Sequence, residues 1–157
     1  MENQHTYRVV AWWASGKTGL AKCDSAPNAV HFAAPPQFGG VEGRWSPEDL
    51  LLSAIASCFT TTFRALADYS DFQFTDLEVE VRGNVRKVDS GYAFEEIVIR
   101  PTLTIATDDG HTRADRLLDK AKRLCLVSRA LGVRQVFEPR VHTTAPLSQV
   151  AEPVTVQ

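Results

Sequence analysis

The sequence of 157 residues predicts an α+β fold. The first third is rich in short β-type segments, a long apolar helix is expected at residues 46–70, and a second helix stands between further strands. The expected order is three strands, a helix, two long strands, a helix and a final strand, which places antiparallel sheets around a buried central helix. The length suits one domain over residues 1–157, with a core at about 7–143 and a loose tail at 144–157.

The N-terminal third contains three segments enriched in β-branched and aromatic residues, and these predict strands at residues 7–13, 20–23 and 29–33. Residues 15–19 (SGKTG) separate the first two strands and indicate a hairpin turn. A phosphate-binding loop would require a glycine at position 11, where this chain has Ala11. We therefore interpret Lys17 as an exposed lysine of the turn.

The segment 46–70 is the element around which the rest is organised. Ser46 suits the N-cap, and Asp49 stands where a capping box requires an acid. Residues 50–59 contain no charge, and a helix that is apolar on nearly every side is buried, either within its own fold or between two copies. Cys58 lies in this apolar stretch.

After the helix, alternating apolar and charged residues over 77–82 predict a half-buried strand. Residues 89–91 indicate a hairpin turn, and the return strand is expected at 92–105. Pro101 within that strand suggests a bulge or an edge position. The two long strands would form a curled antiparallel hairpin able to cover a helix.

The second helix is expected to begin with Thr112 as its cap and to end at Gly132. Its apolar stripe consists of Ala114, Leu117, Leu118, Ala121, Leu124 and Cys125. A last strand is expected at residues 136–142. Because both helices must bury apolar faces in one small core, they are expected to pack together, which could bring Cys58 and Cys125 within disulfide reach.

The composition excludes several classes of function. A net charge of −2 without basic runs argues against a nucleic-acid partner. We find no apolar segment approaching the about 20 residues of a membrane span and no signal peptide, so we expect a cytoplasmic protein without a membrane contact. The three cysteines and four histidines have no metal-ligand spacing, so we expect no metal. In the cytoplasm, a disulfide would be transient and catalytic.

Two motifs carry a resemblance to a known family. Residues 43–58 (GRWSPEDLLLSAIASC) and 121–128 (AKRLCLVS) resemble the two signature regions of the OsmC/Ohr family, the osmotically inducible and organic hydroperoxide resistance proteins. The resemblance extends over about residues 7–142 and implies an OsmC-like fold and an intertwined homodimer. It also implies a thiol-dependent peroxidase. Cys58 would attack an organic hydroperoxide and become a sulfenic acid, and Cys125 would form a disulfide with it. An external dithiol, typically a lipoyl group in this family, would reduce that disulfide, without metal, haem or flavin.

The resemblance also implies a cation beside the nucleophile. A thiol in an apolar pocket has a raised pKa, so we expect a nearby cation to stabilise the thiolate. The family uses an arginine held by a glutamate, which Glu48 matches. Because ten helical residues span about 15 Å, we expect Glu48 of one subunit near Cys58 of the other. We favour Arg44 as the arginine over Lys17, since a lysine cannot make a planar two-point contact. Arg44 as a plain exposed loop charge remains open.

Two other interpretations remain open. One is a non-catalytic protein of this fold that binds a small hydrophobic ligand in the dimer cavity. The other is a structural domain in which the cysteines, Cys23 included, are merely small apolar residues. Many family members have proline after the second cysteine, where this chain has Leu126, so the local geometry of Cys125 is also open.

Overall fold

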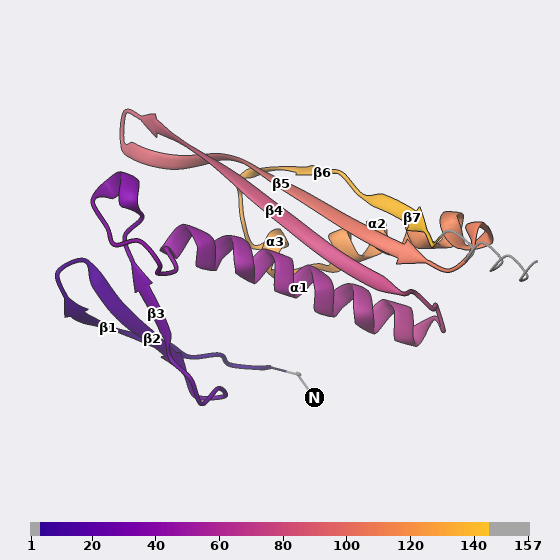
Figure 1. Cartoon of the computed structure of the whole chain (residues 1–157), viewed down its shortest axis with the longest axis horizontal. Coiled ribbons are helices and arrows are strands. Elements are labelled where there is room, and N and C mark those ends of the chain that lie inside the picture. The colour runs from indigo at the N-terminus through magenta and orange to yellow at the C-terminus, as the bar shows by residue number, and fades with distance from the viewer. Residues whose placement is uncertain (1–3, 145–157) are drawn as a thin grey trace, which may run out of the picture. The chain divides into compact units, whose positions relative to one another are not determined.

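The structure, a computed structural model, describes residues 4–144 (Figure 1). The chain divides between Ala54 and Ile55 into two compact units, which are described in turn. Apart from Thr144, the predicted loose tail lies outside the described residues. The α+β class predicted from the sequence is confirmed.

The N-terminal unit is built on a three-stranded antiparallel sheet in the order β1-β2-β3. Its strands are β1 (Val9–Ser15), β2 (Thr18–Cys23) and β3 (Val30–Ala33). The predicted turn joins β1 to β2, and Gly16 there has a φ of 51°, a conformation that favours glycine. A short 3-10 helix, η1 (Pro36–Phe38), follows β3. Lys17 donates from Nζ to the carbonyl oxygen of Phe38 at 2.6 Å, so this side chain ties the hairpin turn to the η1 loop.

Helix α1 (Pro47–Tyr69) begins in this unit and continues into the second. The capping box is confirmed: the backbone N–H of Asp49 donates to Ser46 Oγ at 3.0 Å, and the Ser46 N–H donates to Asp49 Oδ2 at 2.9 Å. The helix ends in a Schellman motif, with Asp71 at φ 49° and the Phe72 N–H donating to the Ala67 carbonyl at 2.8 Å.

The burial of α1 is one-sided. Its fully buried residues follow a spacing of four and form one stripe: Ile55, Phe59, Phe63 and Ala67. Leu51, Leu52 and Ala54 are only half-buried in the single chain. The expectation of a helix buried on nearly every side is therefore met on one face only, because the rest of this chain covers one side of α1.

α1 is also apolar enough to cross a membrane by length and composition, with 23 residues and a window of mean hydropathy 1.5. The expectation that no segment approaches this length was wrong, because the charges of α1 lie toward its ends and leave the middle uninterrupted. Core helices of globular proteins pass the same test. Phe59 and Phe63 are each 0% exposed, and their rings pack on Phe137 and Phe74 with centroid distances of 5.9 and 5.3 Å.

The second unit contains a four-stranded sheet. Its strands are β4 (Asp76–Val88), β5 (Gly91–Ile105), β6 (Arg134–Phe137) and β7 (Arg140–Thr143). β4 and β5 form the predicted antiparallel hairpin, but β6 and β7 both pair parallel to β5. The expectation of purely antiparallel sheets, with one final strand, was thus wrong. The helix after β5 crosses back along the sheet and returns the chain in the same direction.

Pro101 lies in the central strand β5, and the bulge of the hairpin falls between Asn84 and Val85 instead. β6 pairs with β5 up to Ile99 and β7 pairs from Thr102. The proline therefore stands in the gap between these two partners. A residue without an N–H is tolerated there because no ladder hydrogen bond is lost on that side.

Two helices follow β5: α2 (His111–Leu124) and α3 (Leu126–Arg129), with the 3-10 turn η2 (Asp108–Gly110) before them. Thr112 lies inside α2 and does not cap it, because the helical turn of η2 already starts the helix at His111. Where a helix reaching Gly132 was expected, α2 ends at Leu124. That residue is 46% exposed, so it does not belong to the buried stripe.

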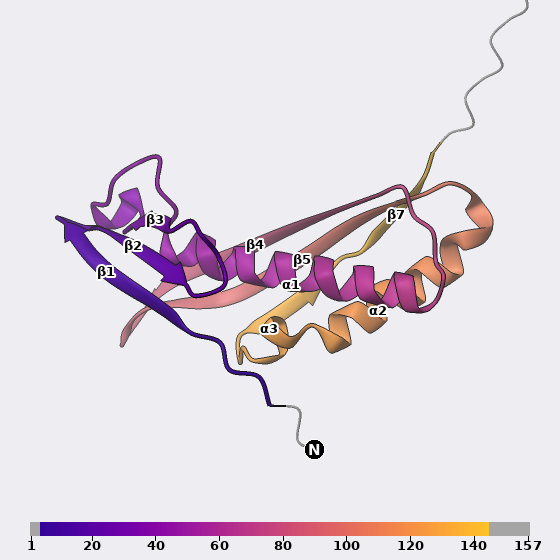
Figure 2. The ribbon, with the colours of Figure 1, turned by 90° about the horizontal axis from the view of Figure 1, so that it is seen from below.

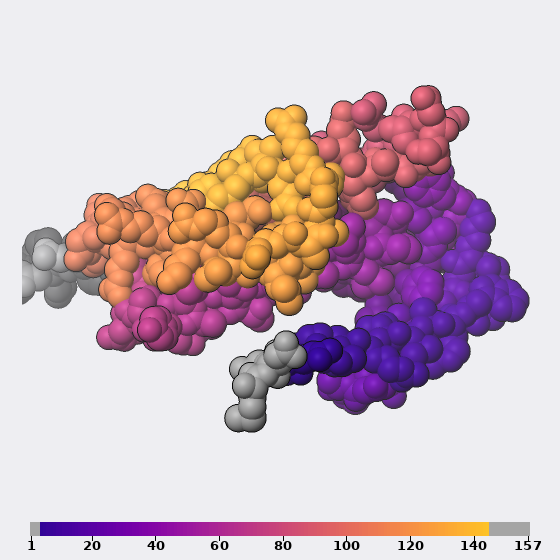
Figure 3. Space-filling model, turned by 180° about the vertical axis from the view of Figure 1, so that it is seen from behind, coloured from indigo at the N-terminus to yellow at the C-terminus, as the bar shows by residue number. Residues whose placement is uncertain are grey.

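Within this unit, α1 and α2 lie side by side on one face of the long hairpin (Figure 2). The inward residues of β5 are buried beneath them: Ile97, Ile99, Pro101, Leu103 and Ile105. The reverse view shows α2 and α3 (orange) packed directly against α1 (magenta) (Figure 3). This packing brings the α2–α3 junction to the middle of α1, where Cys58 lies.

Candidate active site

Cys58 lies half-buried on α1, and Cys125 is the fully buried residue between α2 and α3. The Cys125 side chain hydrogen-bonds the Cys58 thiol, and both cysteines are free thiols. The structure therefore brings these two sequence-predicted site residues together, and both belong to the second unit.

The helix break at Cys125 supplies further contacts to Cys58. Cys125 has φ −60° and ψ 106°, an extended conformation that interrupts the helix, while its own N–H still donates to the Ala121 carbonyl at 2.8 Å. The first residues after a break have N–H groups without an acceptor inside the helix. Backbone hydrogen bonds from Val127 and Leu126 to the Cys58 sulfur lower the pKa of that thiol.

These contacts set the acidity of Cys58. Partial burial raises the pKa of the thiol, but hydrogen bonds to the sulfur from the Val127 N–H, the Cys125 side chain, the Thr62 hydroxyl and the Leu126 N–H outweigh it. The net effect lowers the pKa of Cys58 from its ordinary value. Within this single chain, these hydrogen bonds lower the pKa of Cys58 without a cation beside it, and the expected cation stays a prediction.

The α2–α3 junction is held by a chain of polar contacts. Ser128 is 1% exposed, and its carbonyl accepts a hydrogen bond from Gln135 Nε2 at 2.7 Å. Lys122 Nζ in turn donates to Gln135 Oε1 at 2.7 Å. Because these side chains join α2, α3 and β6, the N–H groups that face Cys58 are held in place by three elements.

The remaining predicted site residues, Glu48, Arg44 and Lys17, belong to the N-terminal unit. Glu48 lies in the first turn of α1, and its Oε2 is buried without a hydrogen-bond partner among the described residues. Arg44 is exposed and forms no ion pair within residues 4–144. Lys17 is engaged with the η1 loop. A buried carboxylate oxygen without a partner is costly, so Glu48 is the residue of this set that requires a partner.

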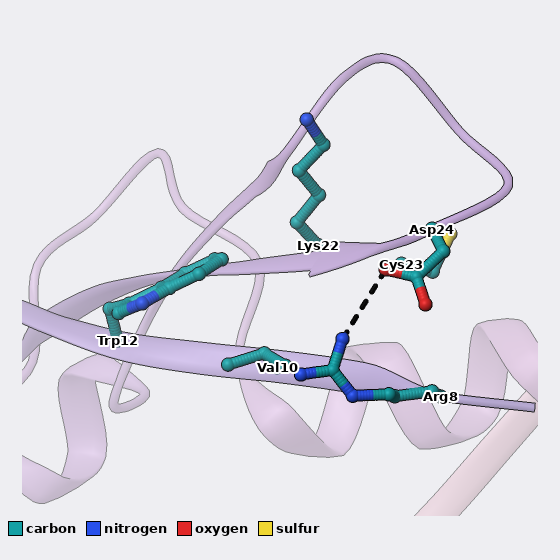
Figure 4. Close-up of a pocket in the computed structure, with 6 residues that line it drawn as sticks. All are labelled: Arg8, Val10, Trp12, Lys22, Cys23 and Asp24. Carbon is teal, nitrogen blue, oxygen red and sulfur yellow. Dashed lines mark hydrogen bonds and ion pairs between the residues drawn. The ribbon is translucent and has the colours of Figure 1, made fainter.

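Cys23 lies elsewhere, at the end of β2, in a shallow pocket of the N-terminal sheet (Figure 4). The pocket is lined by Arg8, Val10, Trp12, Lys22, Cys23 and Asp24. Arg8 and Asp24 pair across its rim at 3.4 Å. The hydroxyl of Ser25 lies 3.4 Å from the Cys23 sulfur. Among the residues that the structure describes, no group of three or more His, Cys, Asp and Glu side chains could hold a metal ion.

Comparison with known proteins identifies the family. The sequence profile of the OsmC family, described as OsmC-like protein, matches residues 40–138. The chain belongs to the OsmC family. The peroxiredoxin OsmC of Escherichia coli is 30% identical over 116 residues, which cover 74% of this chain and 80% of that protein. The uncharacterized protein YmaD of Bacillus subtilis is 25% identical over 130 residues, which cover 81% of this chain and 87% of that protein.

A solved structure shows the same fold. The organic hydroperoxide resistance protein of Elizabethkingia anophelis superimposes with a TM-score of 0.72 at 18% identity, covering 92% of this chain and all of that one. The OsmC-like fold that the sequence motifs implied is therefore confirmed. Membership in the OsmC family indicates a peroxidase-type redox role.

Two contributions to the site escaped the sequence analysis. Thr62 stands four residues after Cys58, and that helical spacing was a signal that could have identified it. The contribution of the Leu126 and Val127 N–H groups could not be predicted from the sequence, because it depends on the backbone break at Cys125.

Proposed function

We propose that this OsmC-family chain is a cysteine-based peroxidase that reduces organic hydroperoxides to alcohols. The observation that supports the proposal most directly is the Cys58 thiol, whose pKa is lowered while a second thiol, Cys125, hydrogen-bonds it. The first property favours the thiolate that attacks peroxides. The second provides a partner for the oxidised sulfur.

In the proposed cycle the Cys58 thiolate attacks the terminal oxygen of the hydroperoxide. The O–O bond breaks, the alkoxide takes a proton and leaves as the alcohol, and Cys58 becomes a sulfenic acid. Cys125 then condenses with it: an S–S bond forms, and water leaves with the sulfenic oxygen. An external dithiol, of the lipoyl type, reduces the disulfide and is itself oxidised to a disulfide.

The proposed working form is a homodimer in the cytoplasm. The half-buried apolar residues of α1, such as Leu51 and Leu52, give a second copy a surface to cover. We infer that Glu48 of one subunit acts near Cys58 of the other, with an arginine, Arg44 in preference to Lys17, as its partner. The buried and unpartnered Oε2 of Glu48 supports such a missing cation.

Thiol titration after one equivalent of cumene hydroperoxide tests the proposal. We expect the wild type to lose two thiols per chain and to release one equivalent of alcohol. Cys58→Ser should lose none, and Cys23→Ser is the matched control that should still lose two. A wild type that retains all its thiols would overturn the peroxidase and favour a protein of this fold that binds a hydrophobic ligand.

A further inference from the structure

The side-chain amide of Gln135, on β6, spans the helix break at Cys125. Its Oε1 accepts a hydrogen bond from Lys122 Nζ at 2.7 Å, and its Nε2 donates to the Ser128 carbonyl at 2.7 Å. Lys122 stands three residues before Cys125 in α2, and Ser128 stands three residues after it in α3. One half-buried side chain from a neighbouring strand therefore joins the two helices on either side of the buried cysteine.

These two contacts use both ends of the amide. A lysine ammonium can only donate a hydrogen bond and a carbonyl oxygen can only accept one, so the group that links them must carry an acceptor and a donor. Glutamine supplies both at the end of one side chain. A glutamate at position 135 would keep the acceptor and lose the donor, and a methionine of similar length would lose both.

The orientation of Cys125 depends on how α2 and α3 are placed against each other. Its N–H donates to the Ala121 carbonyl in α2 at 2.8 Å, whereas its carbonyl accepts the Arg129 N–H of α3 at 3.1 Å. Between these two anchors the backbone leaves the helical conformation, with ψ 106° at Cys125. Because α3 has only four residues, and so short a helix is not stable by itself, contacts with other elements must hold it. The amide of Gln135 supplies such a contact from β6.

We propose that Gln135 is a positioning residue for Cys125: by joining α2 to α3 across the break, it holds this thiol where it forms the disulfide with Cys58. In the proposed cycle the Cys125 sulfur bonds to the sulfenic sulfur of Cys58 and water leaves, so Gln135 itself exchanges no proton or electron. All of these residues belong to the second unit. The place of this step in the cycle rests on the proposed function, whereas the positioning of Cys125 does not.

The test is the equilibrium constant for forming the Cys58–Cys125 disulfide in the full-length protein, measured in a series of glutathione redox buffers without hydroperoxide. Oxidised glutathione takes up the two electrons and two protons of the thiols. The tryptic peptides 45–64 and 124–129 each carry one of the two cysteines and no other, so mass spectrometry of the linked pair reports this disulfide alone.

Gln135→Met should lower this constant about tenfold, which corresponds to about 30 mV in the reduction potential, because the break at Cys125 is no longer held. A side chain that stabilised the dithiol and the disulfide forms equally would leave the constant unchanged. The measurement therefore separates positioning from a general contribution to the stability of the fold.

Gln135→Glu is the second variant, and it should lower the constant as well, since it keeps the contact with Lys122 and loses the donor to the Ser128 carbonyl. Arg134→Ala is the matched control on the same strand. Its neighbour Gln135 points to the opposite face of the sheet, and Arg134 forms an exposed ion pair with Glu96 at 3.3 Å. The constant of this control should stay within about twofold of wild type.

A wild-type constant in either Gln135 variant, or an equal shift in Arg134→Ala, would overturn the inference. A wild type that forms no such disulfide in oxidised glutathione would overturn it too. Hydroperoxide consumption, measured separately, decides the proposed function: a wild type that consumes none contradicts that function, while the glutathione equilibrium still decides whether Gln135 positions Cys125.

Discussion

In both Cys23 and Cys58, hydrogen-bond donors lower the pKa of the thiol. The two cysteines differ in whether a second thiol lies beside the first. The Ser25 hydroxyl lowers the pKa of Cys23 most, with help from the Ala26 and Ser25 N–H groups. Cys58 is likewise surrounded by N–H and hydroxyl donors. Within the described residues, only Cys58 also has a second thiol in hydrogen-bond contact. A favoured thiolate is therefore not sufficient for two-cysteine chemistry, which also needs a second thiol in reach.

The largest expected effect separates these two cysteines directly. Cys58→Ser should reduce the rate of cumene hydroperoxide consumption, followed in the presence of dithiothreitol, by at least about 1000-fold, because the nucleophile is lost. Cys23→Ser should leave the rate within about twofold of wild type, because its thiol has no partner thiol. A strong loss of activity in Cys23→Ser would contradict the claim that only Cys58 of these two cysteines takes part in the reaction.

The second effect concerns the partner thiol. Cys125→Ser should still consume one equivalent of hydroperoxide but should stop at the sulfenic acid, since no second thiol can condense with it. Dimedone labelling, read by mass spectrometry on the peptide 45–64, should rise strongly relative to wild type. A disulfide between Cys23 and Cys58 in this variant would show that Cys23 can also act as a partner thiol, which would contradict the difference drawn between the two cysteines.

A smaller effect should come from the backbone donors. Leu126→Pro removes one N–H from the Cys58 sulfur, and proline is compatible with the first position of a helix and with the extended backbone of Cys125 before it. Alkylation of Cys58 at pH 7 should slow about fivefold, because the pKa of the thiol rises. Leu126→Ala is the control that keeps the N–H and should match wild type. Equal slowing in both variants would assign the effect to the side chain.

The smallest effect is expected at Cys23. Ser25→Ala removes the contact that most lowers the pKa of Cys23, so its thiolate fraction at neutral pH should fall. Alkylation of the peptide 23–44 should slow about threefold at pH 7 and recover as the pH rises toward the ordinary thiol pKa. Hydroperoxide consumption should not change. A parallel loss of consumption would show that Cys23 takes part in the reaction.

The sequence by itself determined a good part of this protein. Ser46 and Asp49 form the capping box that fixes the start of α1, because those contacts are made within one helical turn. The hairpin turn at Gly16 and the order of the elements from β1 to β5 could likewise be predicted from local sequence patterns. The two cysteine motifs identified the family, which the comparison with known proteins then confirmed.

Only the tertiary structure decided how the nucleophile is activated. The apolar stripe through Leu124 and Cys125 predicted an unbroken helix, yet the chain leaves the helical conformation at Cys125. That break leaves the N–H groups of Leu126 and Val127 free to hydrogen-bond a sulfur on another helix, about 70 residues earlier in the chain, and these bonds lower its pKa. Periodicity reports which face of a helix is apolar, but it carries no information on which backbone groups are left without a partner. The parallel pairing of β6 and β7 with β5 depends in the same way on contacts between distant segments, which a local pattern does not encode.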